Sequence, residues 1–189
     1  MLPRRPGARG VLGFSLRRSE TRLRRRGYDS APMPSEALID PDLWRLDRVL
    51  HGPDEIRRVN QQRFEMEQLD GITLLDAERQ EIVGWKDVRA DEFWIRGHVP
   101  GRPLLPGVLQ LESLAQLTSF YIGRTMPDVG FIGFGGVDAV KFRRTVVPGE
   151  RLVLLGKGVE IRSRRAVFDT QGWVDGKLAI EARITGVKV

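Results

Sequence analysis

The sequence contains no cysteine and only two histidines. The absence of cysteine excludes disulfide bonds, thiolate metal sites and a cysteine nucleophile, and it fits a reducing compartment such as the cytoplasm. No apolar run approaches the length of about 20 residues that crosses a bilayer, so we expect no transmembrane helix. Any chemistry must therefore come from other side chains of a globular domain.

Positive charge is concentrated at the N-terminus. Residues 1–27 hold nine arginines and one acid and carry +8, whereas the whole chain carries +6, so the remaining residues carry −2. A basic tail on a slightly acidic body does not indicate specific nucleic-acid recognition. Residues 1–34 also lack hydrophobic periodicity, and we expect them to be disordered. They are an organelle transit segment, a polybasic contact tail, or upstream sequence that precedes a true start at Met33.

Residues 35–70 are predicted to form a helical extension. Asp40 is the expected N-cap of a first helix that ends at Gly52. His51 would lie at the C-terminal end of this helix, where the helix dipole stabilises a cation, so a structural role is favoured over a catalytic one. A second helix is expected over residues 54–69.

From Gly71 onward the pattern changes to strands. The segments 72–76, 81–88, 130–142, 151–162, 165–174 and 177–187 are predicted strands, and Asp175-Gly176 indicates a two-residue hairpin. A helix expected over residues 106–122 is apolar around nearly its whole circumference and should be buried. The sequence thus predicts an α+β domain over residues 71–189, with an antiparallel sheet wrapped around one long buried central helix, which is the hot-dog fold.

Two side chains are candidates for catalysis. Glu112 lies within the apolar helix, where an ionised carboxylate is costly unless it is paired, hydrogen-bonded or protonated. A structural carboxylate, satisfied by a partner chain or by helix-end amides, is the alternative. His98 lies in the segment 96–107, whose three prolines and three glycines predict a stiff, irregular loop. This loop leads to a helix start whose free amides could receive an oxyanion, so a catalytic interpretation is favoured.

Several motifs of the chain resemble those of FabZ-type 3-hydroxyacyl-acyl-carrier-protein dehydratases. Residues 97–100, 103–109 and 112–116 are similar to the family's GHFP, PxMPGVL and EALAQ segments, and residues 136–144 and 146–152 are similar to GIDKARFRR and VVPGDQL. The resemblance covers roughly residues 71–189. Ordered matches over this length are more specific than one short motif.

The resemblance implies that the chain dehydrates 3-hydroxyacyl thioesters to trans-2-enoyl thioesters in fatty-acid biosynthesis. His98 would be the base, Glu112 the acid, and the Gly107 amide would stabilise the thioester oxygen. The partner would be an acyl-carrier-protein or coenzyme A thioester. The family also implies a homodimer in which the histidine and the glutamate of one site come from different subunits, with a trimer of dimers as a larger assembly. No metal or other cofactor is required.

Further residues are given supporting roles. Phe93, Val99, Pro106 and Gln116 are expected to support the site or to line the substrate tunnel. Lys141, Arg143 and Arg144 are expected either to contact an acidic carrier protein or to form an ordinary charged strand edge.

One departure from the family leaves the substrate open. The family's HRxPFLLVDRV stretch is replaced here by residues 64–76, so acyl-chain length and the choice between carrier protein and coenzyme A are not predicted. A thioesterase of the same fold and a non-catalytic acyl-thioester sensor are the alternative functions. The presence of both His98 and Glu112 argues against each of them.

Overall fold

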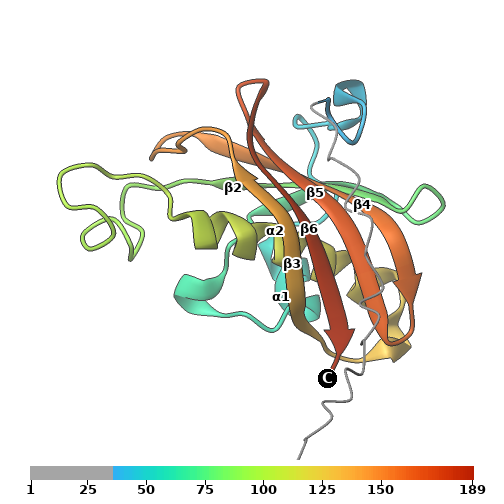
Figure 1. Cartoon of the computed structure of the whole chain (residues 1–189). Helices are drawn as coiled ribbons and strands as arrows, with labels where there is room; N and C mark the ends of the chain where they lie inside the picture. The colour runs from blue at the N-terminus through green and yellow to red at the C-terminus, as the bar shows by residue number, and fades with distance from the viewer. Residues whose placement is uncertain (1–35) are drawn as a thin grey trace, which may run out of the picture. The chain divides into compact units, whose positions relative to one another are not determined.

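The computed structural model describes residues 36–189 (Figure 1). The predicted tail, residues 1–34, and the alternative start at Met33 lie outside the described residues. Between residues 36 and 189, no helix is long and apolar enough to cross a membrane.

The described residues form one six-stranded antiparallel sheet in the order β1-β2-β4-β5-β6-β3 (Figure 1). The strands are β1 (Gly71–Asp76), β2 (Glu81–Asp87), β3 (Ile132–Phe142), β4 (Arg151–Arg162), β5 (Arg165–Val174) and β6 (Lys177–Lys188). All six lie where the sequence predicts strands. The β5–β6 hairpin has φ of 49° at Asp175 and 69° at Gly176, as a type I′ turn requires.

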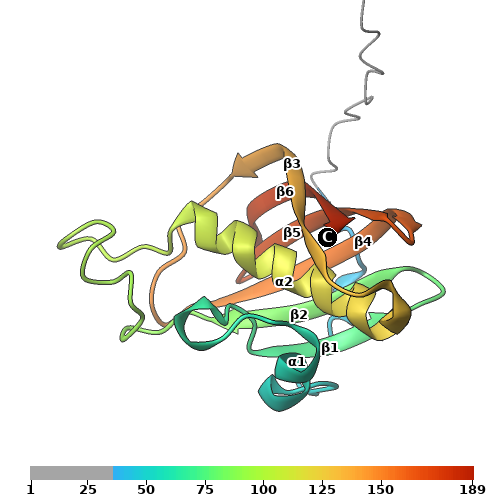
Figure 2. The same ribbon diagram turned by 90° about the horizontal axis from the view of Figure 1, so that it is seen from below.

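The long helix α2 (Gly107–Thr125) lies along one face of the sheet (Figure 2). Leu114, Leu117 and Phe120 of α2 are fully buried in the main hydrophobic core, which also takes Ile82 from β2 and Leu154 from β4. The predicted hot-dog fold, with a sheet around a buried central helix, is confirmed.

The opposite face of the sheet is covered by the segment that precedes β1. Ile39 and Trp44 pack there against Val83, Val153 and Leu155 in a second hydrophobic cluster. Strands covered on both faces lose the alternation of apolar and polar residues, which explains the continuous apolar run 152–155 of β4. The folded unit therefore includes residues before Gly71.

The prediction of two amphipathic helices within residues 35–70 is only partly correct, because the first is absent and the second is shorter than expected. Asp40 does cap a helical turn, but that turn is the short 3₁₀ helix η1 (Pro41–Leu43). The second helix, α1 (Pro53–Val59), ends at Val59, and the side chain of its C-cap Asn60 donates a 3.0 Å hydrogen bond to the Gln116 carbonyl. A second 3₁₀ turn, η2 (Phe64–Met66), follows α1, and a third, η3 (Pro127–Val129), follows α2. Tertiary contacts thus override local helix propensity.

His51 does not lie at the C-terminal end of a helix, because it directly precedes Gly52, the N-cap of α1. It forms an isolated antiparallel bridge with Ile72 of β1. Its ring centroid lies 5.3 Å from that of Phe120, and its Nδ1 lies 3.3 Å from the Glu55 carboxylate. The expected structural role fits this partly buried position, although the expected location at a helix C-terminus is wrong.

Candidate active site

Glu112 projects from the middle of α2 and is held by amide side chains. The Gln116 side chain donates a 2.7 Å hydrogen bond to Glu112 Oε1, and the Gln62 side chain lies 3.4 Å from the same oxygen. Gln116 itself donates to the Met66 carbonyl and accepts from the Gln68 amide. Among residues 36–189, Oε1 of Glu112 has these two partners and Oε2 has none, so Oε2 can meet a substrate.

Glu112 lines a largely apolar groove between α2 and strands β3, β5 and β6. The groove encloses about 500 Å³, part of it open to solvent. Its lining includes Ala115, Ser119 and Ile122, which follow Glu112 along one face of α2, and the aromatic residues Phe131, Phe134 and Phe168. Apolar walls around a single carboxyl group suit an acyl chain that carries one reactive polar centre.

His98 lies on the loop between β2 and α2, which projects from the body of the protein (Figure 1). Its side chain is exposed, and Nδ1 lies 3.0 Å from the Leu104 carbonyl oxygen. A carbonyl oxygen can only accept, so Nδ1 must carry the proton of this hydrogen bond. The neutral imidazole then leaves Nε2 free to accept a proton, as a base must.

Within residues 36–189, no hydrogen bond joins His98 to Glu112, and His98 does not line the groove of Glu112. The chain thus holds a carboxyl group in a groove and presents a histidine elsewhere on an exposed loop.

Gly107 is the first residue of α2, and Pro106 is its N-cap. The first amides of a helix have no partner within the helix, and the helix dipole favours negative charge there. A Cβ at Gly107 would lie 2.7 Å from a ring carbon of Phe142, so a side chain at this position would displace that ring.

The other predicted site residues fall into two groups. Pro106 and Gln116 are buried and hold the start of α2 and the Glu112 carboxyl group. Phe93 and Val99 are exposed on the projecting loop, and neither lines the groove of Glu112.

The three predicted carrier-protein contacts are engaged in ion pairs. Arg143 Nη2 lies 2.6 Å and Lys141 Nζ lies 3.6 Å from Glu181, which is fully buried. Arg144 is paired with Glu150. Lys141 and Arg143 are still about half exposed, at 48% and 47% of their side chains.

The base of the projecting loop is fixed by two further ion pairs. Asp87, at the end of β2, accepts hydrogen bonds of 2.6 and 2.9 Å from Arg151. This hydrogen bonding lowers the pKa of the Asp87 carboxyl group. Asp70 pairs with Arg89 and accepts a 2.7 Å hydrogen bond from the Asp87 amide. The pairing raises the pKa of Arg89, so both ion pairs persist at neutral pH.

Sequence reasoning missed the groove lining and a buried ion pair beneath the loop. Helical spacing places Ala115, Ser119 and Ile122 on the same face of the helix as Glu112. Part of the groove lining could therefore have been predicted from the sequence. Lys86 and Glu92 form the buried ion pair. It becomes visible only in the structure, because the sequence does not show that these two charged side chains are buried.

Comparison with known proteins supports the resemblance that the sequence motifs indicate. A family model described as a FabA-like domain matches residues 60–183. The chain is 38% identical over 132 residues to the 3-hydroxyacyl-[acyl-carrier-protein] dehydratase FabZ of Clostridium botulinum (strain Okra), an alignment that covers 69% of this chain and 91% of that protein. It is 37% identical over 132 residues to the FabZ of Streptococcus agalactiae, covering 69% and 93%.

Solved structures show the same fold at low sequence identity. A chain of the dehydratase heterocomplex ApeI:P from Xenorhabdus doucetiae has a TM-score of 0.61 at 16% identity, covering 71% of this chain and 90% of that one. A hypothetical thioesterase from Streptococcus pneumoniae, determined with coenzyme A, has a TM-score of 0.50 at 11% identity, covering 62% and 84%. The chain belongs to the FabA-like family, and the predicted resemblance is confirmed.

Proposed function

We propose that this chain dehydrates 3-hydroxyacyl thioesters to trans-2-enoyl thioesters, with an acyl carrier protein as the carrier, in fatty-acid biosynthesis. The observation that carries the proposal is the Glu112 carboxyl group, held by Gln116 in an apolar groove. The similarity to FabZ dehydratases supports it.

In the proposed reaction, His98 Nε2 removes a proton from C2 of the substrate. The electron pair moves toward the thioester, and the Gly107 amide at the start of α2 stabilises the developing oxyanion. Protonated Glu112 donates its proton to the C3 hydroxyl group. The C3–O bond breaks, water leaves, and a double bond forms between C2 and C3. The reaction ends with a protonated His98 and an ionised Glu112, and a proton transfer between them through solvent restores the starting state.

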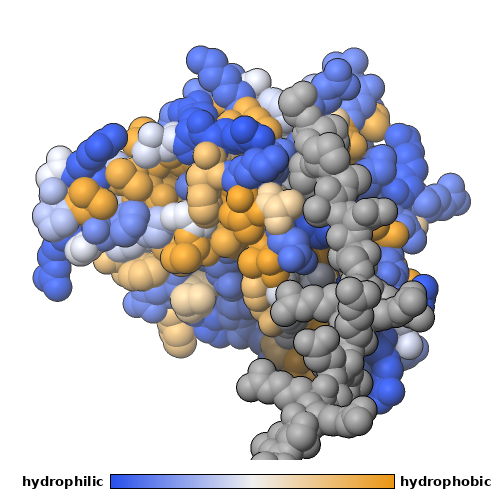
Figure 3. Space-filling view, in the orientation of Figure 1, coloured by the Kyte–Doolittle hydropathy of each residue, from blue (hydrophilic) through white to orange (hydrophobic). Residues whose placement is uncertain are grey.

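The active form is proposed to be a homodimer with shared sites. Strand β3 is at the edge of the sheet and pairs only with β6 among the described strands. Phe131 and Phe134, which line the groove from this edge, are 44% and 53% exposed. Figure 3 shows apolar residues gathered on the side of the molecule where β3 lies. A second copy against this edge would cover these rings and could bring its own His98 to the groove.

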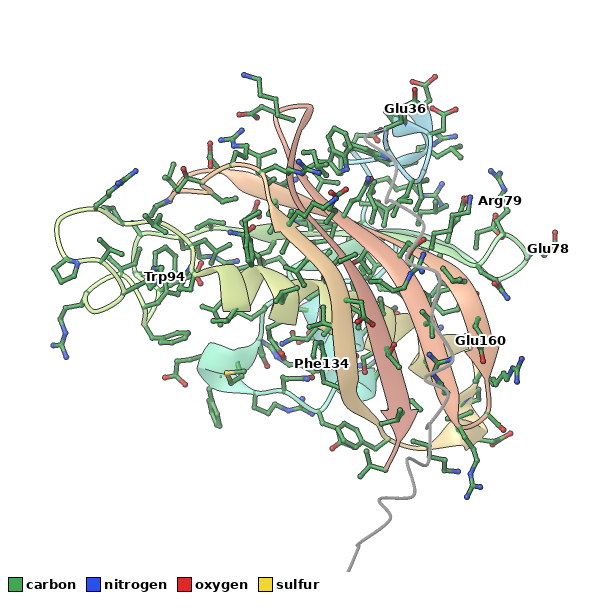
Figure 4. All side chains as sticks on the ribbon, in the orientation of Figure 1. Glu36, Glu78, Arg79, Trp94, Phe134 and Glu160 are labelled. Carbon is green, nitrogen blue, oxygen red and sulfur yellow. The ribbon has the colours of Figure 1, made fainter. Side chains whose placement is uncertain are left out.

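The test is the hydration of a trans-2-enoyl thioester, followed by loss of ultraviolet absorbance. His98→Ala and Glu112→Gln should each lower kcat about 10²- to 10⁴-fold without dissociating the dimer. Glu78→Gln is the matched control, because Glu78 is exposed on the β1–β2 turn, away from the projecting loop (Figure 4). Undiminished turnover in either site variant would refute the assignment.

The same assay separates the alternatives. Carrier-protein and coenzyme A thioesters of one acyl group should be compared at equal concentration, and a lower KM for the carrier-protein substrate is expected. Arg143→Ala, which removes a half-exposed cation, should raise only the KM for the carrier-protein substrate if Arg143 contacts the carrier. Release of free thiol in place of hydration would identify a thioesterase.

A further inference from the structure

The loop that carries His98 rests on a buried ion pair at its base. Lys86, on β2, is 1% exposed, and its Nζ lies 3.0 Å from Glu92 Oε2. The side chain of Glu92 is itself only 10% exposed. Charges are rarely buried unless they are paired and hydrogen-bonded, because leaving water is costly. This pair also lies outside the groove of Glu112, so contact with the groove does not explain it.

Both carboxyl oxygens of Glu92 are used to hold the loop. Oε1 accepts a 2.9 Å hydrogen bond from the Arg89 amide. Oε2 accepts a 2.9 Å hydrogen bond from the Trp94 indole, in addition to the Lys86 contact. Glu92 therefore fixes the backbone three residues before it and the side chain two residues after it.

Trp94 connects Glu92 to the backbone of His98. Its side chain is buried in the main core, 4% exposed, and Figure 4 shows it within the projecting loop. The Trp94 carbonyl oxygen accepts hydrogen bonds from the His98 amide at 2.9 Å and from the Gly97 amide at 3.2 Å. A continuous chain of contacts thus runs from Lys86 through Glu92 and Trp94 to the backbone of His98.

We propose that the Lys86–Glu92 ion pair positions His98, so that its Nδ1 faces the Leu104 carbonyl and its Nε2 is free to act as the base. The proposal rests on the proposed function, because it gives His98 the role of base. Glu92 and Lys86 are positioning residues that act through Trp94 and touch no substrate. The carboxylate supplies the acceptors, and the buried ammonium holds that carboxylate in place.

The test uses double variants, because removing one partner alone would leave an unpaired buried charge. Lys86→Met/Glu92→Leu removes the pair and both acceptors while keeping apolar volume. Lys86→Glu/Glu92→Lys restores an ion pair in reverse, but lysine cannot accept hydrogen bonds from Arg89 and Trp94. The control is Lys157→Met/Glu81→Leu, which removes a 3.0 Å ion pair with a buried glutamate at the other end of β2.

The first measurement is the imidazole tautomer, by nitrogen-15 NMR of histidine-labelled protein. The chain has only two histidines, so His51 serves as an internal reference. In the unaltered protein, His98 should be in the Nδ1–H tautomer. Both Lys86/Glu92 double variants should shift His98 toward the Nε2–H tautomer and leave the His51 signals unchanged, whereas the Lys157/Glu81 variant should change neither.

The second measurement is the kinetics of the dimeric variants. Both Lys86/Glu92 double variants should lower kcat about 10- to 100-fold with KM within about twofold, because a displaced base impairs the chemical step more than binding. If the charge-reversed variant had the kcat of the unaltered protein, the ion pair would have only a structural role, and the proposal would be overturned. An unchanged His98 tautomer would overturn it as well. If His98→Ala retains activity while the tautomer still depends on the pair, the proposed function fails and the positioning of His98 stands.

Discussion

A bulky residue in the groove should limit the length of the acyl chain that the protein accepts. Ser119 lies seven residues after Glu112 on the same face of α2, a rise of about 10 Å along the helix. An extended acyl chain advances about 1.2 Å per bond. The substrate carbon beside Ser119 therefore lies roughly nine carbons along the chain from the substrate carbon beside Glu112. Since Glu112 acts at C3, Ser119 should lie near the end of a twelve-carbon chain. The variant Ser119→Phe places an aromatic ring in that part of the groove.

The size of the effect follows from the methylene groups that the ring displaces. If about four methylene groups leave the groove, at about 0.8 kcal/mol each, the loss is about 3 kcal/mol, or a factor on the order of 200 in kcat/KM. A four-carbon substrate ends well before Ser119 and should be unaffected. The assay is enoyl-thioester hydration with both chain lengths, and Arg124→Phe, at an exposed position on α2 that does not line the groove, is the control. Equal losses for the two substrates, or none for the longer one, would refute a groove that runs along α2.

Three further predictions test the surrounding structure. Trp44→Ala should lower the free energy of unfolding by about 3 kcal/mol, measured in urea, because Trp44 fills the second hydrophobic cluster; a loss below about 1 kcal/mol would contradict its packing there. Arg151 lowers the pKa of Asp87, so the ionised carboxylate stabilises the fold above its unfolded-state pKa, and this stabilisation is lost as the pH falls through the folded-state value. Asp87→Asn should therefore weaken the decline of Tm in acid, and an unchanged decline would show that this ion pair contributes nothing. Gly107→Ala should lower kcat about 10-fold by pushing the first turn of α2 away from Phe142, and Gly107→Ala/Phe142→Leu should recover part of it; no recovery would place the effect elsewhere.

The central part of the fold could be predicted from the sequence because its signals are local. Strands β1 to β6 follow β-branched and aromatic segments, and α2 is marked by its apolar circumference. The Asp175-Gly176 turn was predicted because its two residues readily adopt positive φ.

The segment before β1 could not be predicted, because distant contacts decide its shape. Leu46 is 41% exposed and Leu50 is 39% exposed, so their helical spacing reflects no buried helix face. Ile39 and Trp44 instead cover a sheet face that includes Val83, about 40 positions away, and Val153 and Leu155, which are more than a hundred positions away. Hydrophobic periodicity depends only on residues that are close in the sequence, so it could not predict these contacts.

The candidate site was predicted in its residues but not in its geometry. His98 and Glu112 were recognisable because their segments resemble a known family, and a carboxyl group in an apolar helix is unusual on physical grounds. The sequence carried no signal for the Lys86–Glu92 pair, since burial of a lysine depends on the tertiary structure. The separation of His98 from the groove of Glu112 agrees with the resemblance, which implies that the two residues of one site come from different subunits.

That separation makes the shared site the central claim, and mixing two inactive variants tests it directly. His98→Ala and Glu112→Gln dimers should each be inactive, and after dissociation and reassembly together, half of the dimers should contain one chain of each kind. Each mixed dimer has one site with both groups intact, so about a quarter of the unaltered activity should return. If each chain instead supplied both groups of its own site, the mixture would stay as inactive as its two components.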